Sequence, residues 1–292
     1  MSERTIAEAL SAASARLEGA GRETPRLDAE VLLRHVLGLD RTGLFLRLRD
    51  PLPVTAQTAF EDLVAQRVAG EPVAYLTGVR EFMGLDFAVG PGVLVPRPET
   101  ELLVEWALEW LTERPTGTVL DVGTGSGAIA VAVDAHLPLA WDGGIIGADI
   151  SPAALAVAKE NRDRHGVRDR VCFVRGDLMT WCGGPVDLLL ANLPYLRADQ
   201  VEANADLRPE PVLALDGGAD GLDLIRRLID DAPRFLAPDG ALGLEIDPSQ
   251  AEIVAGLVGA ALPEAAVEIL PDLAGLARHV VARRCPDPSE GD

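Results

Sequence analysis

Cysteine is scarce in this chain, and the few cysteines present exclude several kinds of chemistry. The 292 residues include three cysteines, Cys172, Cys182 and Cys285, with no CxxC spacing among them. An odd number of scattered cysteines is unlike a disulfide framework, so we expect them to be reduced and structural. The four histidines lie on separate segments, which predicts no metal site and no nucleophile paired with histidine.

Positive charge is also in short supply. Lys and Arg number 26 against 46 Asp and Glu, which gives a formal net charge of −20. An acidic surface repels phosphate backbones, so we expect no direct binding of nucleic acid. The chain also lacks an apolar run that could span a bilayer and a basic segment followed by an apolar one at its N-terminus. We therefore expect no membrane association and a cytoplasmic location.

The patterns of apolar residues divide the chain into parts. Helical spacing over residues 1–70 predicts a small all-α bundle. Residues 71–98 hold short β-type runs broken by Gly and Pro, which is typical of a linker that carries a β-hairpin. Strands and helices then alternate, which predicts an α/β domain over residues 99–285, followed by a disordered tail over 286–292.

The α/β domain is predicted to hold a mostly parallel sheet whose last two strands form an antiparallel pair. Asp40, Thr55 and Ser151 are predicted to cap helices. A long loop over 196–218 precedes the helix that leads to the fifth strand. The predicted strands are Thr118–Val122, Gly144–Asp149, Arg170–Arg175, Val186–Ala191, Ala241–Ile246, Ala266–Leu270 and Arg278–Ala282.

A glycine-rich loop between the first strand and the next helix is the candidate cofactor site. Glycines there let the backbone approach a ligand closely, and the start of the helix offers free N–H groups. The loop residues assigned to this site are Asp121, Gly123, Thr124, Gly125, Ser126 and Gly127.

The ends of the next two strands add polar groups to the same site. Asp149, followed by Ile150, is placed to accept hydrogen bonds from both hydroxyls of a ribose, and we expect its carboxylate to need no protein partner. Asp177 is placed near the base, with Leu178 against the ring. The loop also fits the dinucleotide pattern G-x-G-x-x-G/A, so an NAD-linked dehydrogenase is an alternative.

A polar turn, Asn192-Leu193-Pro194-Tyr195, follows the apolar fourth strand. Ligands bind at the carboxyl ends of such strands, although Asn-x-Pro turns also occur as ordinary structure. Asn192 offers an amide oxygen to a substrate N–H, Pro194 restricts the backbone, and Tyr195 supplies an aromatic wall.

The loop and the turn together resemble two motifs of class I S-adenosylmethionine-dependent methyltransferases. The loop resembles D-x-G-x-G-x-G, and the turn resembles the D/N-P-P-Y motif of enzymes that methylate planar nitrogens. The resemblance implies a Rossmann-like α/β fold with a seven-stranded mixed sheet, S-adenosyl-L-methionine as cofactor and S-adenosyl-L-homocysteine as product. It also implies that Asn192, Pro194 and Tyr195 are catalytic, and that Asn192 contacts the cofactor as well. Carbonyl groups of Leu193 or Pro194 would accept the second substrate N–H.

Further segments resemble the HemK or PrmC family of peptide chain release factor N5-glutamine methyltransferases. The resemblance implies methyl transfer to the side-chain amide nitrogen (N5) of the glutamine in the GGQ motif of class I release factors. The helical domain would then recognise this protein substrate. The similar segments are PVAYLTG at 72–78, Glu81, Phe82, Gly84, LVPRPETE at 94–101, Glu210, Pro211, Ala214, Leu215, Gly217, Gly218, Gly221, Leu244, Glu245, Ile246 and Gln250.

Two residues depart from the family pattern. Leu193 replaces the usual proline of the turn, which loosens the geometry but keeps the main-chain carbonyl, and Met83 stands where an aromatic is common. Arg97 is assigned to the substrate site, with a salt bridge to Glu99 as the alternative. Methylation of a ribosomal-protein glutamine and, less favoured because of the charge, adenine-N6 methylation of nucleic acid are the alternative activities.

Overall fold

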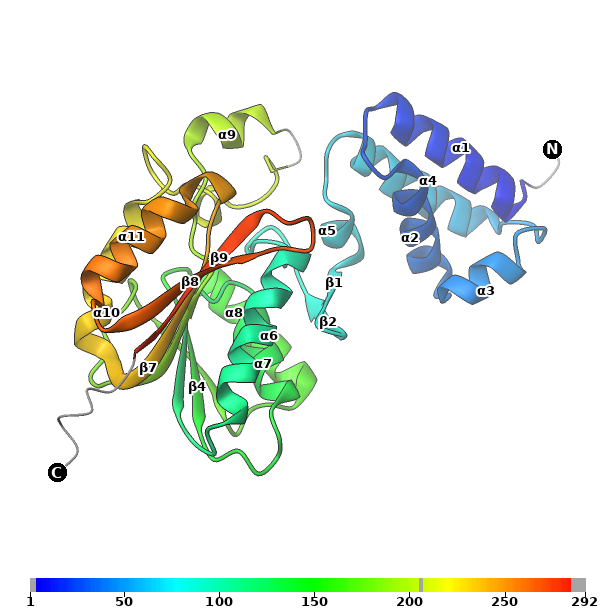
Figure 1. Ribbon diagram of the computed structural model, residues 1–292. Helices are drawn as coiled ribbons and strands as arrows, with labels where there is room; N and C mark the ends of the chain where they lie inside the picture. Colours follow the sequence, from blue (N-terminus) through cyan, green and yellow to red (C-terminus); the bar gives the residue numbers. More distant parts are fainter. Residues whose placement is uncertain (1–3, 205–206, 285–292) are drawn as a thin grey trace. The chain divides into compact units, whose positions relative to one another are not determined.

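The computed structural model describes residues 4–204 and 207–284 (Figure 1). It contains two compact units. One comprises residues 4–79 with 207–209, and the other comprises residues 80–204 with 210–284. We call them the helical unit and the catalytic unit. The predicted tail at 286–292 and Cys285 lie outside the described residues.

The helical unit is built on five helices, in agreement with the helical spacing of its sequence. Thr5 and Glu8 form a capping box at the start of the first helix, and Asp40 caps the third by accepting a hydrogen bond from Gly43 N. The predicted cap at Thr55 is wrong, because the fourth helix already begins at the residue after Pro53. The helices are α1 (Ile6–Gly19), α2 (Pro25–Leu37), α3 (Arg41–Leu46), α4 (Val54–Val68) and α5 (Val73–Thr77).

The segment predicted as a hairpin linker contains both a hairpin and the short helix α5, which was not predicted. A helix of one turn shows no periodicity; here Pro72 precedes it and Gly78 ends it in the left-handed conformation. The hairpin joins β1 (Val79–Phe82) to β2 (Leu85–Ala88) through Met83 and Gly84. Both turn residues have positive φ, as a two-residue hairpin turn of type I′ requires.

The catalytic unit contains a seven-stranded mixed sheet in the order β5-β4-β3-β6-β7-β9-β8. The first five strands in this order are parallel, and β9 is antiparallel to both of its neighbours, which confirms the predicted strand pair. All seven predicted strands are present. They are β3 (Thr118–Val122), β4 (Gly144–Asp149), β5 (Val171–Arg175), β6 (Val186–Ala191), β7 (Leu236–Glu245), β8 (Ala265–Pro271) and β9 (Ala277–Arg284).

Helices cover both faces of this sheet because successive strand residues point to opposite sides (Figure 1). Leu188 and Leu190 belong to one apolar core, whereas Leu189 belongs to the other. The helices α6 (Pro98–Thr112), α7 (Ala128–His136) and α8 (Pro152–His165) lie on one side, and α10 (Asp223–Phe235) and α11 (Ala251–Ala261) on the other. Ser151 caps α8, as predicted. The long loop before α10 contains two unpredicted short helices, α9 (Ala198–Ala203) and η1 (Val212–Ala214).

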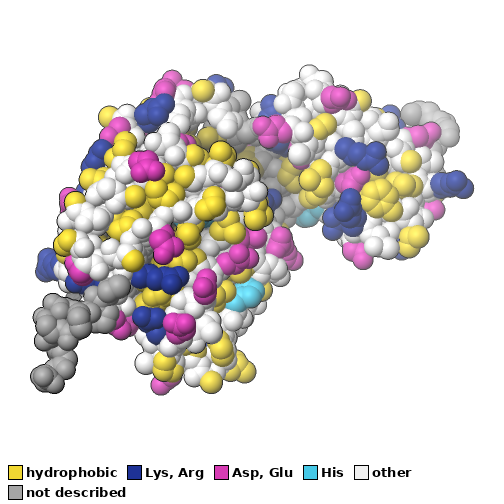
Figure 2. Space-filling model, viewed as in Figure 1, with side chains coloured by type: hydrophobic (Ala, Val, Ile, Leu, Met, Phe, Trp, Pro, Cys, Tyr) yellow, Lys and Arg dark blue, Asp and Glu magenta, His cyan; other side chains and the backbone are white. Residues whose placement is uncertain are grey.

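Charged side chains of both signs are spread over the surface. On the face drawn in Figure 2, the basic side chains of the described residues are scattered among acidic and apolar ones. In residues 4–204 and 207–284, each helix is too short or too polar to cross a lipid bilayer.

Candidate active site

A pocket opens in the catalytic unit at the carboxyl ends of four neighbouring strands, β5, β4, β3 and β6. This is the edge where open α/β sheets bind ligands. Nine of the residues predicted for the site line it. They are Gly123, Gly125, Asp149, Ile150, Asp177, Leu178, Asn192, Leu193 and Pro194. Further walls come from segments to which no site role was assigned, namely Gly92 to Leu94, Pro211, Leu213, Ala214, Leu224 and Arg227.

The glycine loop touches the polar turn directly. Gly123 has a φ of +76°, and a Cβ atom added there would lie 3.0 Å from Leu193 Cδ2. A side chain at this position would therefore be strained and would press on the turn. Strand pairing explains the contact, since Val122 lies opposite Ala191 in the parallel pair of β3 and β6.

The other predicted loop residues hold the loop from behind and do not line the pocket. Asp121 is completely buried, and its Oδ2 accepts hydrogen bonds from Thr124 Oγ1 at 2.5 Å and from Ala130 N at 3.2 Å. Burial raises the pKa of Asp121 to about 7. Ser126 is also buried, and Gly127 packs so tightly that an added Cβ would lie 3.0 Å from Phe173 Cζ. Their contribution to a ligand is therefore indirect.

Asp149 lies in the pocket, but the expectation that its carboxylate has no protein partner is wrong. Its Oδ2 accepts a hydrogen bond from Gly125 N at 2.9 Å, and its Oδ1 accepts one from Ser151 N at 2.8 Å. Each carboxylate oxygen can accept a second bond, so two acceptor positions remain for a ligand. The neighbouring Ile150 is 47% exposed, which leaves an apolar side chain at the pocket edge.

Asp177 also has a partner that its sequence position did not indicate. Arg227 Nη2 lies 2.7 Å from Asp177 Oδ2, and both side chains are about half exposed. Leu178 beside it is 6% exposed and lines the pocket. The pair therefore forms a charged rim next to an apolar wall.

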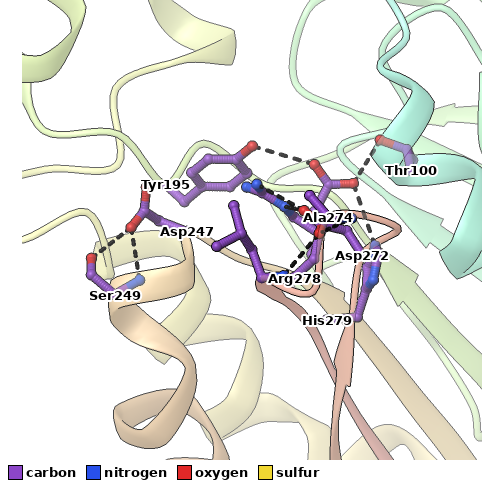
Figure 3. Close-up of polar contacts among 10 residues, drawn as sticks. Thr100, Tyr195, Asp247, Ser249, Asp272, Ala274, Arg278 and His279 are labelled. Carbon is purple, nitrogen blue, oxygen red and sulfur yellow. Dashed lines mark hydrogen bonds and ion pairs between the residues drawn. The ribbon is translucent and has the colours of Figure 1, made fainter.

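Asn192 is fixed by a hydrogen-bonded chain that ends on a buried carboxylate. Its Nδ2 donates to Thr100 Oγ1 at 3.1 Å, and Thr100 Oγ1 donates to Glu245 Oε2 at 2.6 Å. Tyr195 Oη donates to the other oxygen, Glu245 Oε1, at 3.3 Å. Figure 3 shows the hydroxyls of Tyr195 and Thr100 approaching this carboxylate from opposite sides.

Tyr195 does not form the expected aromatic wall of the pocket. Its ring is directed to Glu245, and burial together with the Glu245 charge raises the pKa of its phenol, which keeps the hydroxyl protonated as a donor. The backbone of the turn is held separately, because Gln250 Nε2 donates to Tyr195 O at 3.0 Å. Leu193 is 4% exposed and belongs to the apolar core, so packing anchors the residue that replaces the family proline.

Arg97 forms a salt bridge, but its partner is Glu210 and not Glu99. Arg97 Nη2 contacts Glu210 Oε1, and Glu210 Oε2 accepts a hydrogen bond from Val95 N at 3.0 Å. The Arg97 side chain does not line the pocket. Glu210 is nearly fully buried and immediately precedes Pro211, so this pair joins two segments of the pocket wall.

Four supporting residues were not assigned a role from the sequence. Thr100, Glu210 and Glu245 stand within the segments that resemble the HemK or PrmC family, and this resemblance is the signal that could have identified them. Asn161 had no such signal. It is fully buried on α8, and its Nδ2 donates to Ser126 O at 2.9 Å and to Ala88 O at 3.0 Å. It thereby ties the glycine loop to β2.

The described residues contain no group of three or more His, Cys, Asp and Glu side chains arranged to hold a metal ion. Cys172 and Cys182 are both free thiols, and Cys172 is exposed, which is at odds with a structural role for it.

Comparisons with known proteins agree with the motifs. Residues 8–78 match the family model of the PrmC N-terminal domain, and residues 96–196 match that of ribosomal protein L11 methyltransferase (PrmA). The chain is 44% identical over 282 residues to the release factor glutamine methyltransferase of Moorella thermoacetica, covering 96% of this chain and 99% of the relative. It is 46% identical to the enzyme of that name from Cereibacter sphaeroides, covering 95% and 98%.

A solved structure shares the fold at much lower identity. The hMettl16 catalytic domain, in complex with the MAT2A 3′UTR hairpin 1, has a TM-score of 0.56 at 17% identity, over 78% of this chain and 82% of that one. The relatives named above extend over nearly the whole chain, including the helical unit. This chain therefore belongs to the release factor glutamine methyltransferase family.

Proposed function

We propose that this protein transfers a methyl group from S-adenosyl-L-methionine to the side-chain N5 of the glutamine in the GGQ motif of class I peptide chain release factors. The observation that carries the proposal is the orientation of Asn192. Its Nδ2 is occupied by Thr100, which leaves Oδ1 as the acceptor available to an amide N–H. Near full-length similarity to enzymes named for this reaction supports the substrate.

The residues of the pocket fit S-adenosyl-L-methionine. Gly123 and Gly125 keep one wall free of side chains, Asp149 retains acceptor positions for ribose hydroxyls, and Ile150 and Leu178 offer apolar surface for a flat ring. Asp177 has an unused acceptor oxygen for an exocyclic amine. When bound, the cofactor supplies a methyl group on a positively charged sulfur and leaves as S-adenosyl-L-homocysteine.

The chain's own residues would orient a weak nucleophile. An amide nitrogen shares its lone pair with the carbonyl, so the site must hold the NH2 group and stabilise the positive charge that develops on it. Asn192 Oδ1 accepts one N–H, and the carbonyl of Leu193 or Pro194 accepts the other. With the cofactor bound, the held nitrogen would take the methyl group from the cofactor's sulfur, and the amide would release one proton to solvent. Preorganised acceptors of this kind contribute about 3 kcal/mol to such a transition state.

The helical unit is assigned to recognition of the release factor. Its similarity to the PrmC N-terminal family model supports this role, since that model covers most of the unit. Residues 71–98 would be the linker between the helical recognition domain and the catalytic domain over 99–285.

The decisive experiment is mass spectrometry of purified release factor after incubation with this protein and S-adenosyl-L-methionine. We expect one added methyl group, located by fragmentation on the GGQ glutamine, and no gain with Asn192→Ala. A methyl group on a ribosomal protein or on an adenine instead would replace the proposed substrate. Calorimetric titration with NAD in place of S-adenosyl-L-methionine tests the dehydrogenase alternative, for which no heat is expected.

A further inference from the structure

In the hydrogen-bonded chain from Asn192 through Thr100 to Glu245, the buried carboxylate of Glu245 determines which group donates each proton. Glu245 is 1% exposed, and a carboxylate only accepts hydrogen bonds. The Thr100 hydroxyl, 2.6 Å from Glu245 Oε2, must therefore give its single proton to this oxygen. Its oxygen is then an acceptor for the group on its other side, which is Asn192 at 3.1 Å.

This direction fixes which end of the Asn192 amide faces the pocket. An asparagine amide has nearly the same shape after a flip about its last bond, but the flip exchanges a donor and an acceptor. Turned around, Oδ1 would face the lone pairs of Thr100 Oγ1, with no proton between them. Because Glu245 only accepts hydrogen bonds, Asn192 cannot adopt the flipped orientation, in which its own NH2 group would face the NH2 group of the substrate.

Other charged and titratable groups surround Glu245 without taking over this role. His279 is buried on β9, and its Nε2 lies 3.8 Å from Glu245 Oε2, beyond hydrogen-bond distance (Figure 3). Arg278, on the same strand, pairs with Asp272 at 3.3 Å. Within the described part of the chain, the donors at hydrogen-bond distance from the Glu245 carboxylate are the hydroxyls of Thr100 and Tyr195.

We propose that Glu245 is a positioning residue for methyl transfer, which acts through Thr100 to keep Asn192 Oδ1 directed at the substrate amide. The inference rests on the proposed function for its substrate, but the hydrogen-bond chain exists without one. Glu245 and Thr100 do not line the pocket, so their removal should lower kcat and leave the Kd of S-adenosyl-L-methionine unchanged.

Thr100 gives the first test. Thr100→Val keeps the shape but removes the hydroxyl, and kcat with release factor should fall about tenfold, the equivalent of one hydrogen bond. Thr100→Ser restores the hydroxyl and should recover most of that loss. The matched control is Thr112→Val on the same helix, because Thr112 is exposed and donates only to Leu108 O. Its kcat should equal that of the wild type.

The second test reverses the chain. In Asn192→Asp, two carboxylates compete for the one Thr100 proton, so kcat should fall about a hundredfold. In Glu245→Gln, the amide oxygen meets Tyr195 and the NH2 group donates to Thr100, which then turns its proton toward residue 192 and favours the flipped Asn192. When Asn192→Asp and Glu245→Gln are combined, each donor of the hydrogen-bonded chain again has an acceptor. The NH2 group at position 245 donates to Thr100, and Thr100 donates to the carboxylate introduced at position 192. The double variant should therefore be about tenfold faster than Asn192→Asp alone. A double variant no faster than Asn192→Asp overturns the proposal.

A measurement without substrate separates this inference from the proposed function. The chain has three asparagines, Asn161, Asn192 and Asn204, so protein labelled with 15N-asparagine gives few side-chain amide signals in an NMR spectrum. One Asn192 amide proton should exchange slowly with solvent in the wild type and rapidly in Thr100→Val. Equal exchange in both proteins overturns the inference, whereas a wild type that leaves release factor unmethylated overturns only the proposed function.

Discussion

Two buried carboxylates support neighbouring walls of the pocket, and they obtain their partners in different ways. Asp121 lies behind the glycine loop and Glu245 behind the Asn192 turn, with exposures of 0% and 1%. Each accepts a short hydrogen bond from a threonine hydroxyl, at 2.5 Å and 2.6 Å. The threonine of Asp121 is three positions away in the chain, whereas that of Glu245 is 145 positions away. One support is contained in a motif, and the other forms only when the sheet and α6 pack.

The two carboxylates also differ in how their second oxygen is satisfied. Glu245 Oε1 accepts from Tyr195, whereas Asp121 Oδ1 is buried with no hydrogen-bond partner among the described residues. A buried oxygen without a donor disfavours the ionised form, and the nearby Asp149 charge acts in the same direction, which agrees with the pKa of about 7 for Asp121. Ionisation of Asp121 near neutral pH should therefore reduce the stability of the catalytic unit.

The largest expected effect is a pH dependence that Asp121 causes. Because its folded pKa is raised, its contribution to stability is complete below the unfolded value of about 4 and is lost as pH rises to about 7. Between pH 5 and 7 the free energy of unfolding of the wild type should fall by about 2 kcal/mol relative to Asp121→Asn, which has no such proton. All four tryptophans, Trp106, Trp110, Trp141 and Trp181, lie in the catalytic unit, so their fluorescence in urea reports on it.

Above about pH 8 the two unfolding free energies should run parallel, since Asp121 is then ionised in both states. The unfolding free energy of Glu245→Gln, the variant that lacks the other buried carboxylate, is measured over the same pH range and compared with these two curves. Parallel curves for the wild type and Asp121→Asn from pH 5 upward would contradict the assignment of the proton to Asp121.

The next prediction is that the two walls contribute differently, the glycine-loop wall to cofactor binding and the Asn192 wall to kcat. Thr124→Val removes the hydroxyl that holds Asp121 under the loop, at a cost of about 1.5 kcal/mol. Because Thr124 supports the wall that Gly123 and Gly125 form, the Kd of S-adenosyl-L-methionine should rise about tenfold, with kcat at saturating cofactor within about threefold of the wild type. Thr100→Val should show the opposite pattern. Calorimetry and steady-state kinetics on both variants test this, and the same pattern in both would show that the two supports are not independent.

The same contrast explains how much could be predicted from the sequence. The seven strands, the glycine loop and the turn were predictable because each is a local pattern: an apolar run, a cluster of glycines, or an Asn-x-Pro turn. Their meeting at one edge followed from parallel strand order. Nine predicted site residues line the pocket for this reason.

The wrong expectations concern partners that only the tertiary fold supplies. Arg97 pairs with Glu210, 113 positions away, and not with its neighbour Glu99. Tyr195 turns to Glu245 because a buried carboxylate needs donors, so it could not also form the pocket wall. Short elements were missed too, since α5 and η1 span only five and three residues, and helical periodicity shows only over a window of about 11 residues or more.

A smaller effect is expected where Glu210 joins two wall segments. Glu210→Gln keeps the shape and an acceptor for Val95 N but removes the charge opposite Arg97, which should cost about 1 kcal/mol. Because the flanking segments line the pocket, the KM for S-adenosyl-L-methionine should rise about threefold to fivefold while kcat changes little. Steady-state rates at varied cofactor concentration measure both. A fall in kcat with unchanged KM would instead assign Arg97 to the substrate, as first expected from the sequence.

The smallest effect should come from the charged rim of the pocket, where Asp177 and Arg227 form an ion pair that is exposed to solvent on both sides. Asp177 and Arg227 are each about half exposed, and such a pair contributes about 0.5 kcal/mol. Arg227→Ala should therefore change the Kd of S-adenosyl-L-methionine by no more than about twofold, whereas Asp177→Ala should raise it about fivefold if its carboxylate accepts from the adenine amine. Titration of both variants in low and high salt distinguishes the roles. Equal and salt-sensitive losses would mean that the ion pair itself, and not the Asp177 acceptor, shapes this end of the pocket, because only a charge–charge effect is screened.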